Sequence, residues 1–273
     1  MRKLIVFMFC AALADPVWAA VKVPEFLVTR GHAHNDYLHK RPLLGALELG
    51  YCSIEVDVNL INGGLLVGHS PDRTDPRKTL ESLYLNPLLD QARADHGKIY
   101  PQGPVTIQLL IEFKSDAERS YAALKPILER YSRMLTSFDK DGAHLGAVTV
   151  VITGHVPWDS LRRESFRYAA ADTDQVSSDA PDTLAPLLSL RWGNFISWSA
   201  GRWIGRDIPA KELSKLRALV EAAHAKHRRI RFWDAPDNAR AWSVLYDAGV
   251  DLINTDDLAG LQRFLKCRDA RAR

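Results

Sequence analysis

This chain has few cysteines and no large excess of either positive or negative charge. Three cysteines occur among 273 residues, and 36 lysines and arginines nearly balance 33 aspartates and glutamates, giving a net charge of +3. No basic block is long enough to indicate a nucleic-acid partner, although a mild positive bias favours contact with phosphate groups. The composition, 47% hydrophobic and 25% charged residues, is typical of a globular protein with one large core.

Long hydrophobic runs are also missing, except for one near the N-terminus. Arg2 and Lys3 precede an apolar stretch, Leu4–Leu13, and Val17-Trp18-Ala19 offers a small-residue cleavage site. The stretch is only about half as long as a membrane-spanning helix requires. We therefore expect a signal peptide over residues 1–19, followed by an exported, periplasmic or secreted protein over residues 20–273 without a transmembrane segment. Two cysteines would remain, and nothing in the sequence indicates whether they pair.

Strand-like and helix-like segments alternate along the mature chain. The predicted strands are "FLVTRGH", "YCSIEVDVNL", "VTIQLLIEFK", "AVTVVITG", "FRYAAAD", "FISWSA", "RIRFWDA" and "VDLINT". An "NGG" turn leads from the second strand into "LLVGHS" and predicts a hairpin. The longer predicted helices cover residues 79–95, 117–136, 208–227, 238–248 and 257–266. Close to eight such units, with no disordered linker, favour an α/β fold with a single (β/α)8 TIM barrel and no second domain.

Three carboxylates are expected to meet at one mouth of this barrel. Glu55 and Asp57 are two residues apart on a predicted strand, so both point toward the barrel axis, and Glu112 ends the next strand. Like charges in a half-buried space repel each other unless a cation lies between them. Cys52 points to the other face of its strand, and a ligand set of oxygens favours Mg²⁺ or Ca²⁺ over zinc. The alternatives are a solvated acidic surface or an ion pair with Lys114.

Histidines and a neutral amide lie close to these carboxylates in the predicted fold. His32 and His34 follow the first strand, and His69 follows the hairpin after the second strand. Two histidines on opposite sides of a metal-bound ester are suited to act as general base and general acid. Asn35, beside His34, can add an oxygen ligand to the cation.

Other polar residues at strand ends can contact a substrate. Lys114 ends the third strand and can neutralise a phosphate oxygen. Arg231 and Trp233 end the seventh strand, where they can either shape the pocket or pack inside the barrel. Asp256 or Asp257 is expected to cap the last helix.

The run "HNDYL", followed by "SIEVDV", "LLVGHS" and "LLIEFK", resembles the phosphodiesterase barrel superfamily. This superfamily includes phosphoinositide-specific phospholipase C and the glycerophosphodiester phosphodiesterases. The C-terminal "RFWDAPD" and "GVDLINTDD" resemble the closing strands of glycerophosphodiesterase-like proteins. The resemblance implies a metal site and a catalytic pair formed by Glu55, Asp57, Glu112 and Asn35 together with His34 and His69.

Two departures from the named subfamilies affect the site. The glycerophosphodiesterases usually carry HRG after the first strand and ENT soon after, and this chain has "GHAHNDY" and no ENT. Spider-venom-type phospholipase D barrels have a GHxxN pattern, which would select His32 as the catalyst. The first catalytic histidine is therefore open between His32 and His34. The whole pattern is most similar to the branch that includes the fungal altered inheritance of mitochondria 6 proteins.

The resemblance implies a metal-dependent phosphoric diester hydrolase. Its substrate would be a small-molecule or lipid phosphodiester, such as a glycerophosphodiester or a (lyso)phospholipid. A histidine of the first strand would deprotonate a hydroxyl and His69 would protonate the leaving oxygen, and one route passes through a cyclic phosphate.

Two other classes of protein stay open. His32 and His34 form an HxH pair, as in zinc amidohydrolase-type barrels, although the predicted fifth and sixth strands supply no histidine. A non-catalytic barrel that binds a phosphate-containing ligand is the second alternative.

Overall fold

Eight parallel strands form a closed barrel in the computed structural model, which describes residues 23–102, 106–198 and 207–271. The strands follow one another around the barrel in chain order, and pairing of the first strand with both the last and the second closes the ring. They are β1 (Gly31–Ala33), β2 (Ser53–Ile61), β4 (Ile107–Phe113), β7 (Val148–Gly154), β8 (Ala169–Thr173), β9 (Leu187–Arg191), β10 (Arg229–Trp233) and β11 (Leu252–Thr255). The predicted (β/α)8 barrel is confirmed.

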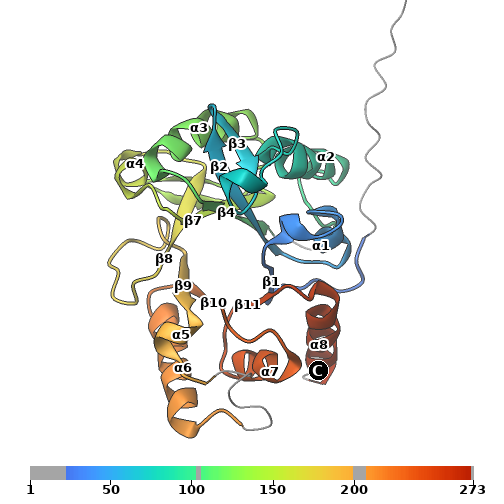
Figure 1. The fold of residues 1–273 in the computed structure, drawn as a ribbon, viewed down its shortest axis with the longest axis vertical. Helices are drawn as coiled ribbons and strands as arrows, with labels where there is room; N and C mark the ends of the chain where they lie inside the picture. Colours follow the sequence, from blue (N-terminus) through green and yellow to red (C-terminus); the bar gives the residue numbers. More distant parts are fainter. Residues whose placement is uncertain (1–22, 103–105, 199–206, 272–273) are drawn as a thin grey trace, which may run out of the picture.

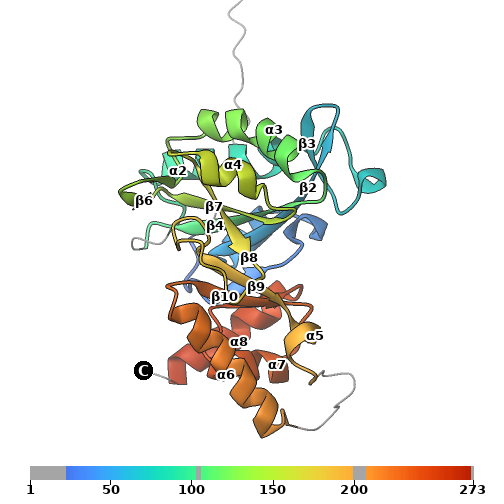
Figure 2. The same ribbon diagram turned by 90° about the vertical axis from the view of Figure 1, so that its left-hand side faces the viewer.

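Helices connect the strands and surround the barrel, as Figures 1 and 2 show. The α-helices are α1 (Leu44–Glu48), α2 (Asn86–Ala94), α3 (Ala117–Arg130), α4 (Trp158–Arg163), α5 (Trp192–Phe195), α6 (Ala210–His224), α7 (Ala239–Asp247) and α8 (Leu258–Arg271). Short helical turns are η1 (Asp36–Leu38), η2 (Pro71–Arg73) and the π-helical η3 (Glu81–Leu85), which runs into α2. The helix predicted over residues 79–95 therefore begins with the π-helical turn η3 and continues as α2.

Two hairpins are added to the barrel. β3 (Gly64–Val67) pairs antiparallel with the end of β2, as predicted from "NGG". Asn62 and Gly63 both have positive φ, 50° and 82°, which is the geometry of the tight turns that join twisted strands. The second hairpin, β5 (Ser137–Asp139) with β6 (Gly142–His144), lies between α3 and β7.

The strand predicted at "FISWSA" is wrong. The sixth barrel strand is β9, eight residues earlier, whereas Phe195 ends α5 and residues 196–198 have no regular structure; residues 199 and 200 lie outside the described part. Ile196 and Trp198 are each only 1% exposed, and the Trp198 carbonyl accepts a hydrogen bond from the Trp192 indole. Burial against other aromatic rings, rather than pairing in the sheet, explains the apolar character of this segment.

The interior of the barrel is divided into layers. An apolar cluster of Leu110, Val151, Leu187 and Leu252 fills its middle, separate from the larger core between the sheet and the helices. Along each strand, side chains two residues further on share the inward face. Polar residues therefore lie directly above the apolar cluster, at the C-terminal ends of the strands.

No helix among the described residues is long and apolar enough to cross a membrane. The predicted signal peptide, residues 1–19, lies outside the described residues. Cys52 is buried and Cys267 is exposed, and both are free cysteines.

Candidate active site

A cavity of about 590 Å³ lies at the C-terminal ends of the barrel strands. It contains most of the side chains that the sequence selects: His34, Asn35, Glu55, His69, Glu112, Lys114, Arg231 and Trp233. His32 and Asp57 are fully buried and lie behind this lining. A cavity of this size is ordinary for a small-molecule site.

Glu55, Asp57 and Glu112 converge, each offering an oxygen within 4.8 Å of the others. The register of the sheet produces this cluster, because Asp57 on β2 is the direct neighbour of Glu112 on β4. Glu55 lies two residues earlier on the same face of β2. At the adjacent position Gly154, a Cβ atom would lie 2.7 Å from Cγ of Glu112, so glycine leaves room for the glutamate.

Lys114 pairs with two of the three acids. Its Nζ lies 2.7 Å from Oε1 of Glu112 and 3.1 Å from Oδ2 of Asp57, so the ion pair that the sequence offered as an alternative is present. Burial and the neighbouring carboxylates nevertheless raise the pKa of Glu112 despite the pairing with Lys114. Even with Arg231 paired to Glu55, the three carboxylates face only two cationic side chains, and the raised pKa of Glu112 reflects burial together with the repulsion among them.

The donor atoms fit a hard divalent cation. Oδ1 of Asp57 is buried and has no hydrogen-bond partner among the described residues, and an unpaired buried carboxylate oxygen is costly. Glu55 and Glu112 place further carboxylate oxygens beside it. Oxygen ligands of this kind suit Mg²⁺ or Ca²⁺. Asn35 lines the same cavity.

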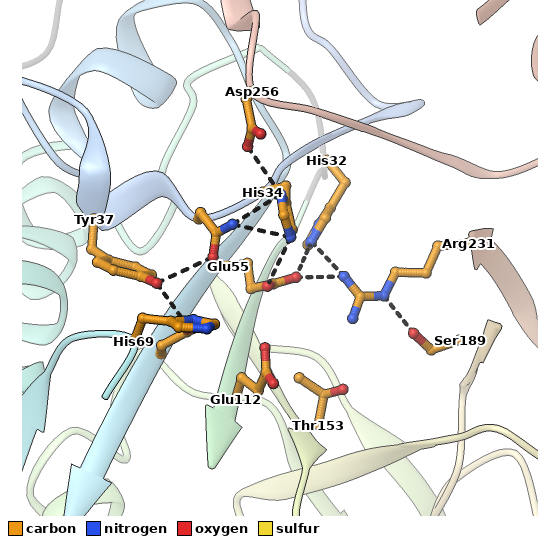
Figure 3. A network of polar contacts seen from close by, with 12 residues as sticks. His32, His34, Tyr37, Glu55, His69, Glu112, Thr153, Ser189, Arg231 and Asp256 are labelled. Atoms are coloured by element: carbon orange, nitrogen blue, oxygen red, sulfur yellow. Dashed lines mark hydrogen bonds and ion pairs between the residues drawn. The ribbon is translucent and has the colours of Figure 1, made fainter. Parts of the chain in front are cut away.

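Glu55 is held from behind by two buried side chains (Figure 3). Its Oε2 forms an ion pair with Nη1 of Arg231 and lies 2.8 Å from Nε2 of His32. Burial alone would raise the pKa of Glu55, but the Arg231 guanidinium and the His32 hydrogen bond hold it well below its usual range. Glu55 is therefore an anion whose second oxygen, Oε1, is directed toward His34.

His32 is fully buried, and its two ring nitrogens contact protein groups. Nδ1 lies 2.8 Å from the Ser53 hydroxyl and Nε2 contacts Glu55. Burial lowers the pKa of His32 to about 4, although the hydrogen bond to Glu55 opposes this shift. Both ring nitrogens of His32 are therefore engaged by protein groups, and the ring lies behind Glu55.

His34 and His69 both reach the cavity, and each has its Nδ1 held by a carboxylate. Nδ1 of His34 lies 2.9 Å from Oδ1 of Asp256, and its Nε2 lies 3.8 Å from Oε1 of Glu55. Nδ1 of His69 lies 3.0 Å from Oδ2 of Asp57. The carboxylate contacts orient both imidazoles through Nδ1, and Nε2 of His34 also lies 3.2 Å from the side-chain amide nitrogen of Asn35.

Tyr37 connects the first histidine loop to the acidic cluster. Its hydroxyl lies 2.8 Å from Oδ2 of Asp57 and 3.2 Å from Oδ1 of Asn35. Asn35 has a left-handed backbone, φ 47° and ψ 39°, a conformation that asparagine tolerates better than most residues. This turn directs His34 and Asn35 into the cavity.

Three residues of the site were missed or assigned differently from the sequence. The sequence left the cap of the last helix open between Asp256 and Asp257: Asp257 caps α8 by accepting a hydrogen bond from the Gly260 amide, and Asp256 contacts His34. Asp172 lines the cavity, and Tyr37 bridges its wall. For Asp172 and Asp256 the available signal was an acid at the C-terminal end of a barrel strand.

The sequence profile of the AIM6-like phosphodiesterase domain matches residues 24–172, and that of the glycerophosphoryl diester phosphodiesterase family matches residues 229–259. Altered inheritance of mitochondria protein 6 from Eremothecium gossypii is 31% identical over 278 residues, covering 87% of this chain and 70% of the relative. Its homolog from Arthroderma benhamiae is 29% identical over 272 residues, covering 85% and 84%.

The fold is similar to that of a glycerophosphodiester phosphodiesterase from Parabacteroides distasonis, with a TM-score of 0.53 and 16% identity over 92% of this chain and 98% of that chain. Fold and sequence together define a barrel of the glycerophosphodiesterase and phospholipase C-like superfamily. Within it, the chain belongs to the AIM6-like phosphodiesterase family.

Proposed function

We propose that this protein is a phosphoric diester hydrolase that uses a divalent cation, Mg²⁺ or Ca²⁺. The observation that carries the proposal is the placement of two carboxylate-oriented histidines at a cluster of three carboxylates in one cavity. The matches to the AIM6-like phosphodiesterase domain and to the glycerophosphoryl diester phosphodiesterase family support this class of reaction.

In the proposed reaction, His34 is the general base. Its Nδ1–H donates a hydrogen bond to Asp256. The lone pair on Nε2 then accepts a proton from the attacking hydroxyl. That hydroxyl belongs either to the substrate, which gives a cyclic phosphate, or to water. Bond formation at phosphorus and loss of this proton occur together.

His69 is the general acid on the other alcohol. With Nδ1 directed to Asp57, its Nε2–H donates a proton to the leaving oxygen as the P–O bond breaks. Lys114 lies between Asp57 and Glu112, where its charge can stabilise the phosphoryl oxygens.

Glu55, Asp57 and Glu112, with the amide oxygen of Asn35, would hold the cation. When bound, it would polarise the phosphoryl group. Arg231 keeps Glu55 ionised for this role, and Trp233 contributes to the substrate end of the cavity. From the sequence, Arg231 was a candidate for direct contact with the substrate. In our proposal it instead contacts Glu55.

The buried environment of His32 disfavours the zinc amidohydrolase alternative. Zinc would need both members of the HxH pair, and Nε2 of His32 is already in contact with Glu55 and Arg231. The three-carboxylate group found in the described part of the chain includes no histidine. We further propose, from the N-terminal sequence, that the protein is exported.

Hydrolysis of bis(p-nitrophenyl) phosphate by metal-stripped protein, titrated separately with Mg²⁺, Ca²⁺ and Zn²⁺, tests the proposal. We expect turnover with Mg²⁺ or Ca²⁺, and a loss of about a hundredfold or more in His34→Ala and in His69→Ala. His144→Ala is a matched control, because His144 is an exposed histidine that pairs with Asp139 away from the cavity. Activity with zinc alone, or full activity in either site variant, would refute the assignment.

A further inference from the structure

Four consecutive polar residues follow β1, and their side chains have different surroundings. His34 and Asn35 line the cavity. Asp36 is buried and anchors the loop from behind by accepting hydrogen bonds. Tyr37 points toward the acidic cluster (Figure 3). The proposed reaction gives His34 and Asn35 a task, whereas the task of the Tyr37 hydroxyl has to be read from its contacts.

The two carboxylate oxygens of Asp57 have opposite surroundings. Oδ2 has three polar partners: the Tyr37 hydroxyl at 2.8 Å, Nδ1 of His69 at 3.0 Å and Nζ of Lys114 at 3.1 Å. Oδ1 is buried and has no hydrogen-bond partner among the described residues. Such an oxygen is costly unless a partner binds there. The contacts at Oδ2 therefore hold the carboxylate in the orientation that keeps Oδ1 available.

Of these three partners, Tyr37 is the one that can fix Asp57 without opposing a bound cation. Lys114 shares its ammonium group between Asp57 and Glu112, and its positive charge repels a metal ion in the same cluster. The His69 side chain is 58% exposed, and in the proposed reaction it exchanges a proton. Tyr37 is neutral, and its ring packs against the large core. Its hydroxyl stabilises the carboxylate by a charge-assisted hydrogen bond and adds no positive charge.

We infer that Tyr37 is a positioning residue of the cation site: its hydroxyl fixes Oδ2 of Asp57 and thereby presents Oδ1 to the metal ion. This inference rests on the proposed function, which places Mg²⁺ or Ca²⁺ at this cluster. The hydroxyl also lies 3.2 Å from Oδ1 of Asn35, but its single hydrogen favours the shorter bond to the charged Asp57. Outer partners of this kind orient the ligands of a metal and tune its affinity.

Isothermal titration of metal-stripped protein with Mg²⁺ and with Ca²⁺ tests the role of the hydroxyl. In Tyr37→Phe we expect the Kd of the ion that the wild type binds to rise about tenfold. Tyr84→Phe is the matched control, because the Tyr84 hydroxyl donates to Asp36 at the same distance of 2.8 Å, outside the three-carboxylate cluster. Its Kd should stay near the wild-type value. Urea unfolding without metal should show the reverse order, since the Tyr84 bond is fully buried and its loss costs more stability.

A double-mutant cycle shows whether the hydroxyl acts through Asp57. If it does, Tyr37→Phe should raise the Kd much less in an Asp57→Asn background than in the wild type. An equal rise in both backgrounds, an unaltered Kd in Tyr37→Phe, or an equal rise in Tyr84→Phe would overturn the inference. Loss of cooperative urea unfolding in Tyr37→Phe would overturn it as well, because the role would then be structural.

Hydrolysis of bis(p-nitrophenyl) phosphate by the wild type separates this inference from the proposed function. Turnover with Mg²⁺ or Ca²⁺, together with unaltered cation affinity in Tyr37→Phe, would refute the positioning role alone. Weaker cation binding in Tyr37→Phe, with no turnover by the wild type, would refute the phosphodiesterase and retain the positioning role. A wild type that binds neither Mg²⁺ nor Ca²⁺ would refute both.

Discussion

Nδ1 of His34 and Oδ1 of Asp256 lie 2.9 Å apart although 222 positions separate them in the chain. The closure of the barrel creates this pair, because β1 and β11 are parallel neighbours in which Ala33 lies beside Thr255. The residue after each of these two partners therefore emerges at the same point of the barrel mouth. The pair fixes which nitrogen of His34 faces the cavity.

Replacing Asp256 by asparagine should impair the base without removing it. The amide no longer stabilises the imidazolium that forms when His34 takes a proton, and it can select the wrong tautomer. We expect kcat for bis(p-nitrophenyl) phosphate to fall about a hundredfold or more, with a smaller change in KM. Steady-state kinetics of the Asp256→Asn variant at saturating divalent cation measure this loss.

The adjacent acid provides the control. Asp257 caps α8 through the Gly260 amide, so Asp257→Ala should cost about 1 kcal/mol of stability and leave catalysis intact. The roles assigned to the two aspartates would be exchanged if Asp257→Ala lost activity and Asp256→Asn kept it.

Removing one carboxylate of the cluster should weaken cation binding. In Glu112→Gln and in Asp57→Asn, the cation loses a charged ligand while Lys114 remains in place. We expect the Kd for Mg²⁺ or Ca²⁺ to rise by well over tenfold, since even the loss of an outer hydrogen-bond partner can have an effect of about that size. Isothermal titration of metal-stripped protein measures the change, with the exposed Glu129→Gln as control. Unaltered affinity in both site variants would exclude this cluster as the metal site.

The pair between Arg231 and Glu55 should matter for stability as well as for the site. Both side chains are almost fully buried, so Arg231→Met leaves the buried Glu55 carboxylate without its guanidinium partner and with only its histidine contacts. We expect the free energy of unfolding to fall by about 3–5 kcal/mol, and Glu55→Gln in the same chain to recover part of it. Urea unfolding measures both effects.

Arg191→Met is the matched control for that experiment. Arg191 pairs with Asp234 at the rim, where both side chains are about half exposed, so its loss should cost less than about 1 kcal/mol. Equal losses in Arg191→Met and Arg231→Met would mean that the buried pair has no special role.

The alternation of elements and the period of two along a strand predicted the barrel and the neighbourhood of Glu55, Asp57 and Glu112. Those features depend on local spacing and on the general rule for the C-terminal ends of barrel strands. The "FISWSA" segment was placed wrongly because burial and β pairing leave the same apolar signature in a short run.

Contacts that close the ring could not be predicted from local patterns. Whether Arg231 reaches Glu55 or a substrate depends on how β10 and β2 face each other across the barrel interior, and no spacing along the chain reports this. The same limit applies to the choice between His32 and His34. His32 lies on β1 and His34 directly follows it, and only the three-dimensional arrangement shows that His32 lies behind Glu55 while His34 lines the cavity.

The last prediction concerns the pH dependence of stability. Burial raises the pKa of Asp172 to about 6, although Arg231 and the hydroxyls of Thr153 and Ser189 oppose the shift. Because the folded pKa lies above the unfolded value of 3.8, the folded protein binds more protons between these two values. The stabilisation is therefore complete below about pH 4 and is lost as the pH rises through about 6.

Asp172→Asn removes this titration, so its difference in unfolding free energy from the wild type should depend on pH. Relative to the wild type, the variant should gain up to about 3 kcal/mol between pH 4 and pH 7, the equivalent of a shift of about two pKa units. Urea unfolding of both proteins across this range measures the difference, from which the other titrating groups cancel. The same series with Asp182→Asn should be flat, because Asp182 is exposed. A flat series for Asp172→Asn would show that Asp172 stays ionised in the folded barrel, with its charge balanced by Arg231.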